Sequence, residues 1–232
     1  MGIVKENLKD VKEKVKETCI KKGIDYKNVT IVAVTKTVDT DIIKEAIDAG
    51  VTDIGENKVQ EIQRKYEDIK GLANVHMIGH LQSNKVRHII DKAKLIHSVD
   101  RISLMKEISK RAKAADIVSN ILIQVNVSGE ETKYGISIKE VEEFIKSSAK
   151  YDNIKIKGLM TIAPFTEDPE ETRCVFRALK EKYDELSKKV FKNASMEYLS
   201  MGMTNDYAIA LEEGSNMLRV GTAIFGKRVY SR

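Results

Sequence analysis

The sequence is poor in the residues that mark several common protein classes. It has two cysteines, two prolines and no tryptophan among its 232 residues. Cys19 and Cys174 are far apart and lack the short spacing of metal ligands, which argues against a disulfide scaffold and predicts ordinary thiols in a reducing compartment. No apolar run approaches the roughly 18 residues of a membrane span, and the N-terminus lacks the apolar core of a signal peptide. We therefore expect a soluble, cytoplasmic protein that does not enter a membrane.

Charge of one sign is not concentrated anywhere in the chain. The formal net charge of +5 is small for this length, and lysines are interleaved with acidic residues as on solvated helix faces. No dense basic run is interleaved with aromatic residues, so we expect no nucleic-acid partner. The histidines lack metal-helix spacing such as HExxH, so we expect no metal site. An open alternative is a binding module whose basic surface docks acidic partners or nucleic acid.

What the sequence does contain is a regular alternation of helical and strand-like segments. A helical segment opens the chain, and short apolar runs then alternate with helical periodicity. Strands are expected at about 30–35, 52–55, 75–79, 95–98, 121–127, 154–160, 197–199 and 217–220. Such units without a Pro/Gly-rich linker predict one α/β domain over 1–232, a (β/α)8 TIM-type barrel with an extra N-terminal helix. A doubly wound open sheet is the second choice, weakened because no GxGxxG follows the first strand.

Capping signals indicate where the helices begin. Serine, threonine, asparagine and aspartate at a helix start accept hydrogen bonds from the free N–H groups of the first turn. Helix starts are expected at Asn57 with Gln60, Asp100, Ser137 with Glu140, Asp168 with Pro169, and Thr204 or Asn205. A further helix is expected around 84–91.

Lys36 is the most informative single residue. It ends the run 31–36, which is apolar on both alternating faces, as in a parallel strand covered on both sides. In a barrel, the C-terminal strand ends surround the site of chemistry. Partial desolvation there lowers the pKa of a lysine amine and makes it a nucleophile able to form a Schiff base. The alternative is a solvated lysine that merely ends a strand.

The segments after the seventh and eighth strands have the composition of an anion site. Gly202 and Gly221 allow close approach of backbone N–H groups, and Ser200 and Thr222 add hydroxyl groups. In (β/α)8 barrels, phosphate groups are frequently bound after these two strands. Taken alone, either glycine only permits a turn. Together with the hydroxyls, they favour a phosphate site.

Arg219 lies inside the apolar run 217–220, where an unsatisfied guanidinium is costly. It either pairs internally with an acid such as Glu56 or donates to a ligand in the barrel mouth. A Schiff-base lysine, a phosphate site and this arginine together suit pyridoxal 5′-phosphate (PLP), with Lys36 on C4′ and Arg219 on the ring nitrogen. Because arginine does not release its proton, the ring nitrogen would stay an unprotonated acceptor and the ring a poor electron sink.

At these residues the sequence resembles the pyridoxal phosphate homeostasis protein family, single-domain relatives of the alanine racemase barrel. The resemblance covers nearly the whole chain and is carried by the segments 32–36, 54–61, 76–85, 158–160, 199–203 and 219–226. It implies PLP on Lys36, phosphate contacts from Ser200, Gly202, Gly221 and Thr222, a ring-nitrogen contact from Arg219, and Asn57 and Met201 as pocket residues.

The resemblance also implies a function without catalysis. Members of this family are understood to bind and buffer PLP in vitamin B6 and amino-acid homeostasis, which would make PLP-dependent apo-enzymes the recipients. A racemase needs an acid/base group on each face of the substrate carbon, and Lys36 supplies one. The opposing tyrosine of alanine racemases comes from an extra β-domain, and only residues 227–232 follow the last matched segment, so we expect a monomer that is not an enzyme.

Two alternatives stay open. One is a weak PLP-dependent amino-acid racemase-type enzyme that uses Tyr134, His80 or Tyr207 as its second group. The other is a second, transferable PLP held near the mouth by lysines. The candidates for it are Lys85, Lys133 and Lys227.

Overall fold

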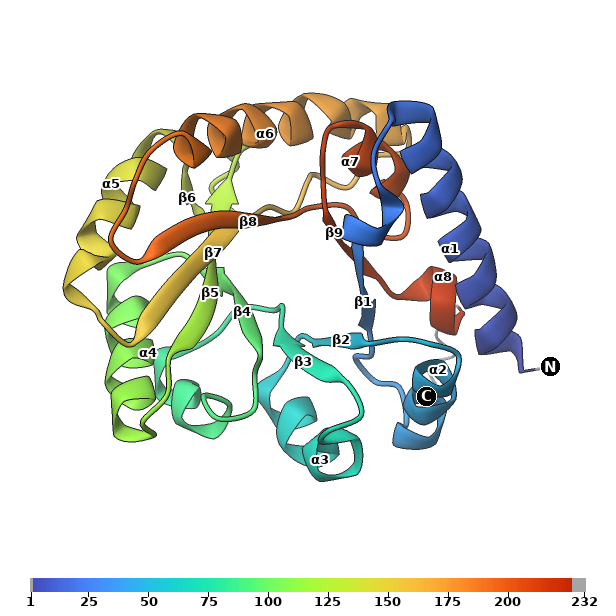
Figure 1. Cartoon of the computed structure of the whole chain (residues 1–232), viewed down its shortest axis with the longest axis horizontal. Helices are drawn as coiled ribbons and strands as arrows, with labels where there is room; N and C mark the ends of the chain where they lie inside the picture. The colour runs from blue at the N-terminus through green and yellow to red at the C-terminus, as the bar shows by residue number, and fades with distance from the viewer. Residues whose placement is uncertain (1, 227–232) are drawn as a thin grey trace.

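Short strands, most of them largely buried, close into a parallel barrel in the computed structural model, which describes residues 2–226 (Figure 1). The barrel strands are β1 (Thr30–Val34), β2 (Asp53–Glu56), β3 (Asn74–Met77), β4 (Leu95–Val99), β5 (Ser119–Asn126), β7 (Ile154–Met160), β8 (Ala194–Ser200) and β9 (Met217–Val220). Their spatial order is β4-β3-β2-β1-β9-β8-β7-β5, and the pairing of β4 with β5 closes the ring. The predicted (β/α)8 barrel is confirmed, and the open sheet is wrong because both edges are paired. A two-residue strand, β6 (Ile136–Ser137), adds to β5 and was not expected.

Helices surround the barrel on its outside (Figure 1). The α-helices are α1 (Ile3–Lys22), α2 (Thr40–Asp48), α3 (Val59–Ile69), α4 (Ile102–Ala114), α5 (Val141–Ser147), α6 (Arg173–Ser187), α7 (Tyr207–Glu212) and α8 (Thr222–Phe225). The 3-10 helices are η1 (Tyr26–Asn28), η2 (Ser83–His88), η3 (Ile138–Glu140), η4 (Ser148–Lys150) and η5 (Pro169–Thr172). The expected N-terminal helix is α1, which packs beside α2, α7 and α8. Its buried stripe, spaced three and four residues apart, comprises Val4, Leu8, Val11 and Val15.

Two of the expected helix starts are confirmed. Ser137 and Glu140 form the predicted capping box, although the helix begins with the 3-10 turn η3 before α5. Asp168 accepts the N–H of Glu170 with Pro169 at the first helical position, again at a 3-10 turn, η5, which leads into α6.

The other expected helix boundaries differ from the observed ones. The helix expected at Asn57 begins at Val59 without a side-chain cap. Asp100 pairs with Arg101 at 2.7 Å and does not cap α4. The segment around 84–91 forms the 3-10 helix η2, and α7 begins at Tyr207 after Asp206.

The hydrophobic core has two parts, inside and outside the barrel wall. Successive strand residues point to opposite faces, so Val32 lies inside while Ala33 packs outward against the helices. The inner cluster comprises Val32, Leu95, Leu122, Met160 and Met217, with Tyr198 packed against it. A barrel of this kind is a filled core, so ligands bind at its ends.

Two properties of the described residues bear on function. No helix within residues 2–226 combines the length and the apolar character needed to cross a bilayer. Over the same residues, no group of three or more histidine, cysteine or carboxylate side chains gathers closely enough to hold a metal ion.

Candidate functional site

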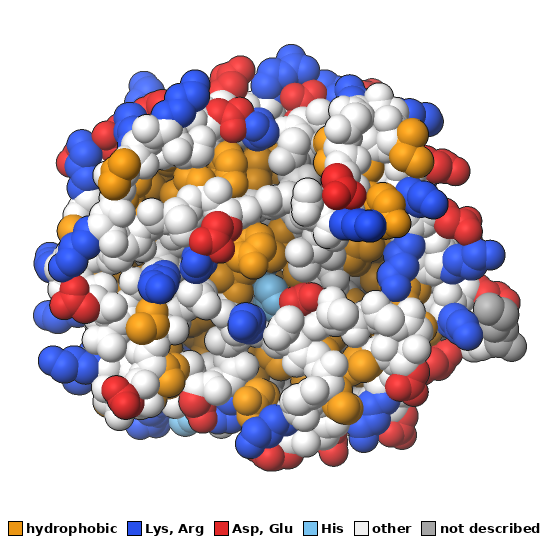
Figure 2. Space-filling model, viewed as in Figure 1, with side chains coloured by type: hydrophobic (Ala, Val, Ile, Leu, Met, Phe, Trp, Pro, Cys, Tyr) orange, Lys and Arg blue, Asp and Glu red, His pale blue; other side chains and the backbone are white. Residues whose placement is uncertain are grey.

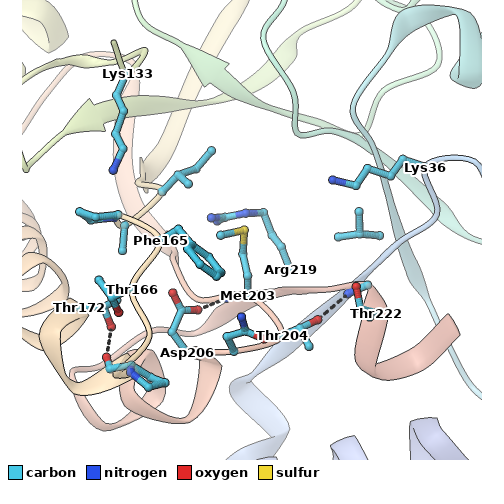
Figure 3. Close-up of a pocket in the computed structure, with 17 residues that line it drawn as sticks. Lys36, Lys133, Phe165, Thr166, Thr172, Met203, Thr204, Asp206, Arg219 and Thr222 are labelled. Carbon is cyan, nitrogen blue, oxygen red and sulfur yellow. Dashed lines mark hydrogen bonds between the residues drawn. The ribbon is translucent and has the colours of Figure 1, made fainter. Parts of the chain in front are cut away.

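A cavity of about 450 Å³ opens at the C-terminal end of the barrel strands. Lys36 enters it from the turn after β1, and Arg219 enters it from β9. Figure 3 shows the Lys36 amine pointing across the cavity toward Arg219, with Lys133 extending into it from the opposite side. Of the residues expected from the sequence, the structure therefore brings Lys36, Arg219, Gly221 and Thr222 to one opening.

A buried ionic network lies behind the turn that carries Lys36. Lys65, on α3, has no exposed side-chain surface, and its amine lies 2.8 Å from a carboxylate oxygen of Glu56 and 2.8 Å from one of Glu61. Burial raises the pKa of Glu56 although Lys65 and a threonine hydroxyl oppose the shift. Burial also opposes ionisation of Glu61, but the hydrogen bond and charge of Lys65 outweigh it and lower the pKa of Glu61.

The network fixes the backbone on both sides of Lys36. Lys65 donates to the carbonyl oxygen of Thr35 at 2.7 Å, and the Thr35 hydroxyl donates to Glu56 at 2.7 Å. On the other side, Glu61 accepts the N–H of Thr37 at 3.3 Å. Thr37 has a φ of 63°, a left-handed conformation that a β-branched residue adopts only when its surroundings impose it. The cavity-facing direction of Lys36 is thus set by packed, ionic contacts.

Arg219 is buried in the barrel interior, with 3% of its surface exposed. Its guanidinium donates to the Ser200 hydroxyl oxygen at 2.6 Å and to the Thr161 carbonyl oxygen at 2.8 Å. Burial lowers the pKa of Arg219 to about 10, opposed by the charge of Asp206, so the guanidinium remains protonated at neutral pH. The alternative of an ion pair with Glu56 is wrong, because that carboxylate is paired with Lys65.

Backbone N–H groups converge on one hydroxyl oxygen where β9 meets α8 at the cavity wall. Gly221 and Ala223 both direct their N–H groups at the Thr204 hydroxyl, each at 3.4 Å. Thr204, Gly221 and Thr222 all line the cavity. A side chain at Gly221 would bring its Cβ within 3.2 Å of the Val34 Cβ, so glycine keeps this wall close to β1. The two N–H groups and the Thr204 hydroxyl thus form one polar cluster on this wall, next to Thr222.

The remaining predicted site residues do not line this cavity. The Ser200 hydroxyl is fully buried and is bonded to Arg219 and His97, at 2.6 and 3.1 Å. Met201 is buried in the outer core. Gly202 has a φ of +93°, and a Cβ there would lie 2.6 Å from the Ala210 Cβ, so this glycine allows the chain to pack against α7. Asn57 lies beside the backbone of Gly79.

The three candidates for a second acid/base group do not line the cavity. His80 stacks on Tyr134 with ring centroids 3.9 Å apart. Tyr207 is 8% exposed and belongs to the outer core. Among the titratable side chains of the described residues, the cavity walls carry Lys36, Lys133, Asp206 and Arg219.

Two parts of the cavity were not predicted from the sequence. One is the segment 162–166 after β7, which includes the 87% exposed Phe165. The other is Asp206, whose carboxylate accepts the N–H of Met203 at 2.5 Å. Both follow strands at the barrel mouth, so their position in the chain was a usable signal.

The lysines suggested for a second PLP are not brought together. Lys133 lines the cavity and pairs with Glu130 at 2.9 Å, whereas Lys85 lies on η2 outside the cavity lining. Lys227 lies outside the described residues.

Comparison with known proteins identifies the family. The sequence model described as "Alanine racemase, N-terminal domain" matches residues 4–229. The pyridoxal phosphate homeostasis protein of Aquifex aeolicus is 42% identical over 226 residues, covering 97% of this chain and 98% of that protein. The chain belongs to the pyridoxal phosphate homeostasis protein family. The Escherichia coli K12 family member is 34% identical over 243 residues, with complete coverage of both chains.

Solved structures of similar proteins have the same fold. PipY of Synechococcus elongatus PCC7942, determined with PLP bound, superposes with a TM-score of 0.83 at 28% identity and covers 96% of this chain and 100% of that one. D-threonine aldolase from Filomicrobium marinum gives a TM-score of 0.73 at 16% identity, covering 96% of this chain and 60% of its own, and shares the fold alone. The resemblance and the alanine racemase-like barrel expected from the sequence are both confirmed.

Proposed function

We propose that this chain binds PLP in the cavity at the C-terminal end of its barrel and acts as a PLP carrier or buffer in vitamin B6 and amino-acid homeostasis. The observation that carries the proposal is the convergence of the Lys36 amine, the buried Arg219 guanidinium and the anion-facing donors around Gly221 on one cavity. The homeostasis proteins of A. aeolicus and E. coli and the PLP-bound structure of PipY support it.

The residues present fit the chemical groups of PLP. The Lys36 amine would bond to the aldehyde carbon as a Schiff base, with the aldehyde oxygen leaving as water. Arg219 has N–H groups beyond its contacts with Ser200 and Thr161, and these would donate to the ring nitrogen. The amides of Gly221 and Ala223, with the Thr222 and Thr204 hydroxyls, would take the phosphate. The cofactor supplies a reactive aldehyde and an electron-withdrawing ring when bound.

We infer that the chain does not use the cofactor for catalysis. An arginine keeps its proton, so it holds the ring nitrogen as an acceptor and limits the ring as an electron sink. Tyr134, His80 and Tyr207 do not line the cavity, which leaves the racemase alternative without the three residues suggested as its second group. On this proposal, loss of α-deuterium from labelled amino acids proceeds no faster with the protein than with free PLP. Clearly faster loss would make the chain an enzyme.

The role of Lys36 is tested by its substitution. The protein reconstituted with PLP should show the visible absorption band of a protein-bound Schiff base, and borohydride should fix PLP to the peptide that contains Lys36. Lys36→Ala should lose both signals. Lys9→Ala, at a 67% exposed side chain on α1, is the matched control and should retain them. A visible band that persists in Lys36→Ala would overturn the assignment.

We propose a single PLP-binding domain over 1–232 that is monomeric, cytoplasmic and able to hand PLP to PLP-dependent apo-enzymes. Reactivation of an apo-enzyme faster by the loaded protein than by an equal concentration of free PLP would support delivery. Equal rates would show that the protein only stores PLP. Sedimentation at micromolar concentration would check the monomer.

A further inference from the structure

A row of polar side chains crosses the apolar interior of the barrel. From the cavity inward, Arg219 lies 2.6 Å from the Ser200 hydroxyl, which lies 3.1 Å from Nδ1 of His97. Nε2 of His97 lies 2.9 Å from Nδ1 of His76, and Nε2 of His76 lies 3.0 Å from a carboxylate oxygen of Asp53. The five residues come from β9, β8, β4, β3 and β2, so only closure of the barrel brings them together.

When both imidazoles are neutral, the chemistry of the two ends sets the direction of every hydrogen bond in the row. A guanidinium can only donate and a carboxylate can only accept. Ser200 therefore accepts from Arg219, and its own proton is available for Nδ1 of His97. The Nε2 proton of His97 then goes to Nδ1 of His76, and the Nε2 proton of His76 goes to Asp53. Each polar atom in the row is satisfied when both imidazoles are neutral and carry their proton on Nε2.

Burial favours a neutral His97. The pKa of His97 is held well below its usual value, mainly by burial and further by the nearby charge of Arg219. The hydrogen bonds of His76 and Thr52 outweigh the effect of burial and lower the pKa of Asp53, which keeps its carboxylate ionised as the final acceptor.

We propose that His97 and His76 are positioning residues that hold the Arg219 guanidinium toward the PLP ring through Ser200. The row is then one hydrogen-bond relay that runs from the cavity to the opposite end of the barrel. This inference rests on the proposed function, because one of its tests measures the binding of PLP. The Ser200 hydroxyl is engaged on both sides within the relay, which assigns it to Arg219 and His97 instead of the phosphate. Thr161 supports the other guanidinium nitrogen.

The far end of the relay opens to solvent. A second cavity, of about 260 Å³, is lined by Asp53 and His76 together with the charged pair Lys157 and Glu197. Figure 2 shows a histidine beside an acidic side chain in a hollow at the centre of the barrel end. The relay therefore joins two solvent-connected cavities through an otherwise apolar core.

The direction of the relay can be tested without the cofactor. Nitrogen-15 and proton correlation spectra of the histidine rings in the ligand-free, full-length protein should show His76 and His97 as neutral rings protonated on Nε2. Signals are assigned with His97→Gln and with the peripheral His88→Gln. A proton on Nδ1 of either ring would overturn the proposed direction, whatever the protein does with PLP.

The positioning role is tested by comparing two substitutions of similar size. His97→Gln keeps one acceptor and one donor, while His97→Leu removes both. We expect His97→Leu to raise the dissociation constant for PLP about tenfold and to shift the visible absorption maximum, with both properties rescued in His97→Gln. His88→Leu is the control and should bind PLP as the wild type does.

Failure of the inference is distinguishable from failure of the proposed function. If His97→Leu binds PLP with wild-type affinity and spectrum, the positioning role is wrong while PLP binding stands. If the wild type forms no visible band with PLP, the proposed function fails and the ring spectra still decide the relay. Should His97→Leu not fold, Ser200→Ala breaks the next link and should give the same tenfold loss and spectral shift. Wild-type binding by Ser200→Ala would overturn the role.

Discussion

The Lys65 amine lies 2.8 Å from a carboxylate oxygen of Glu56, and neither side chain has any exposed surface. Removing two charges from water is costly, and their attraction offsets that cost only when both partners are present and further hydrogen bonds satisfy them. Here the Thr35 carbonyl accepts from Lys65 and the Thr35 hydroxyl donates to Oε1 of Glu56, while Oε2 of Glu56 has no hydrogen-bond partner among the described residues. The structural support of the proposed PLP lysine is therefore a buried ionic cluster directly behind its turn.

Breaking this cluster should be strongly destabilising. Lys65→Met leaves the Glu56 charge buried without its partner, and we expect a loss of about 3–5 kcal/mol in the free energy of unfolding, measured by urea denaturation. Lys9→Met, which removes an exposed i,i+4 pair with Glu13, should cost no more than about 0.5 kcal/mol. Adding Glu56→Gln to Lys65→Met should recover part of the loss. If Lys65→Met and Lys9→Met lowered the free energy of unfolding by similar amounts, the stabilising role of the buried Lys65–Glu56 pair would be contradicted.

The same cluster should give the protein an acid-sensitive component of stability. The pKa of Glu61 is lowered in the folded state from its ordinary value of 4.5, so ionised Glu61 stabilises the fold above that pH and the contribution is lost as pH falls through the folded-state pKa. Glu61→Gln should be less stable than the wild type at pH 7. The difference should shrink steadily below pH 4.5. A stability difference between the two proteins that grows on acidification would contradict the lowered pKa of Glu61 in the folded state.

The contact between β7 and β8 depends on a glycine. Gly158 has a φ of +141°, and a Cβ there would lie 1.9 Å from the Tyr198 carbonyl oxygen, so Gly158→Ala must separate two barrel strands. We expect a destabilisation of about 3 kcal/mol or more by thermal or urea unfolding. Gly71→Ala is the matched control, since its φ is +79° and no atom lies within 4 Å of the added carbon. It should cost about 1 kcal/mol from backbone strain alone.

Phosphate recognition can be separated from recognition of the ring. Thr222→Val removes a hydroxyl at the anion-facing wall and keeps the shape of the side chain. The dissociation constant for PLP should rise about tenfold, as expected for the loss of a hydrogen bond to a charged group. Binding of pyridoxal, which has no phosphate, should be nearly unchanged. Equal weakening of both ligands would place Thr222 away from the phosphate.

Much of the architecture could be predicted from local patterns. Alternation of short apolar runs with helical periodicity is a property of neighbouring residues, and it led to the barrel and to β7 with its observed bounds, Ile154–Met160. Helix starts were less predictable because a capping side chain has competing partners. Asp100 illustrates this, since it pairs with Arg101 instead of capping α4.

The partners of the polar residues in the barrel interior could not be predicted from local sequence patterns. The sequence predicted a costly arginine at position 219 but offered Glu56 as its internal partner, and the structure pairs Glu56 with Lys65. His97 and Ser200 are 103 residues apart in the chain yet hydrogen-bonded. No periodicity relates such positions, because the register and closure of the strands set their distance.

The sequence by itself determined the barrel, its N-terminal helix and the placement of Lys36 and Arg219 at strand ends, since strand direction and burial follow from residue spacing. Only the tertiary structure decided which buried charges pair, that Ser200 faces Arg219 and His97, and that Thr204 and the segment 162–166 form walls of the cavity. The physical reason is that buried polar groups must find partners within about 3 Å, and closure of the barrel selects those partners from distant parts of the chain.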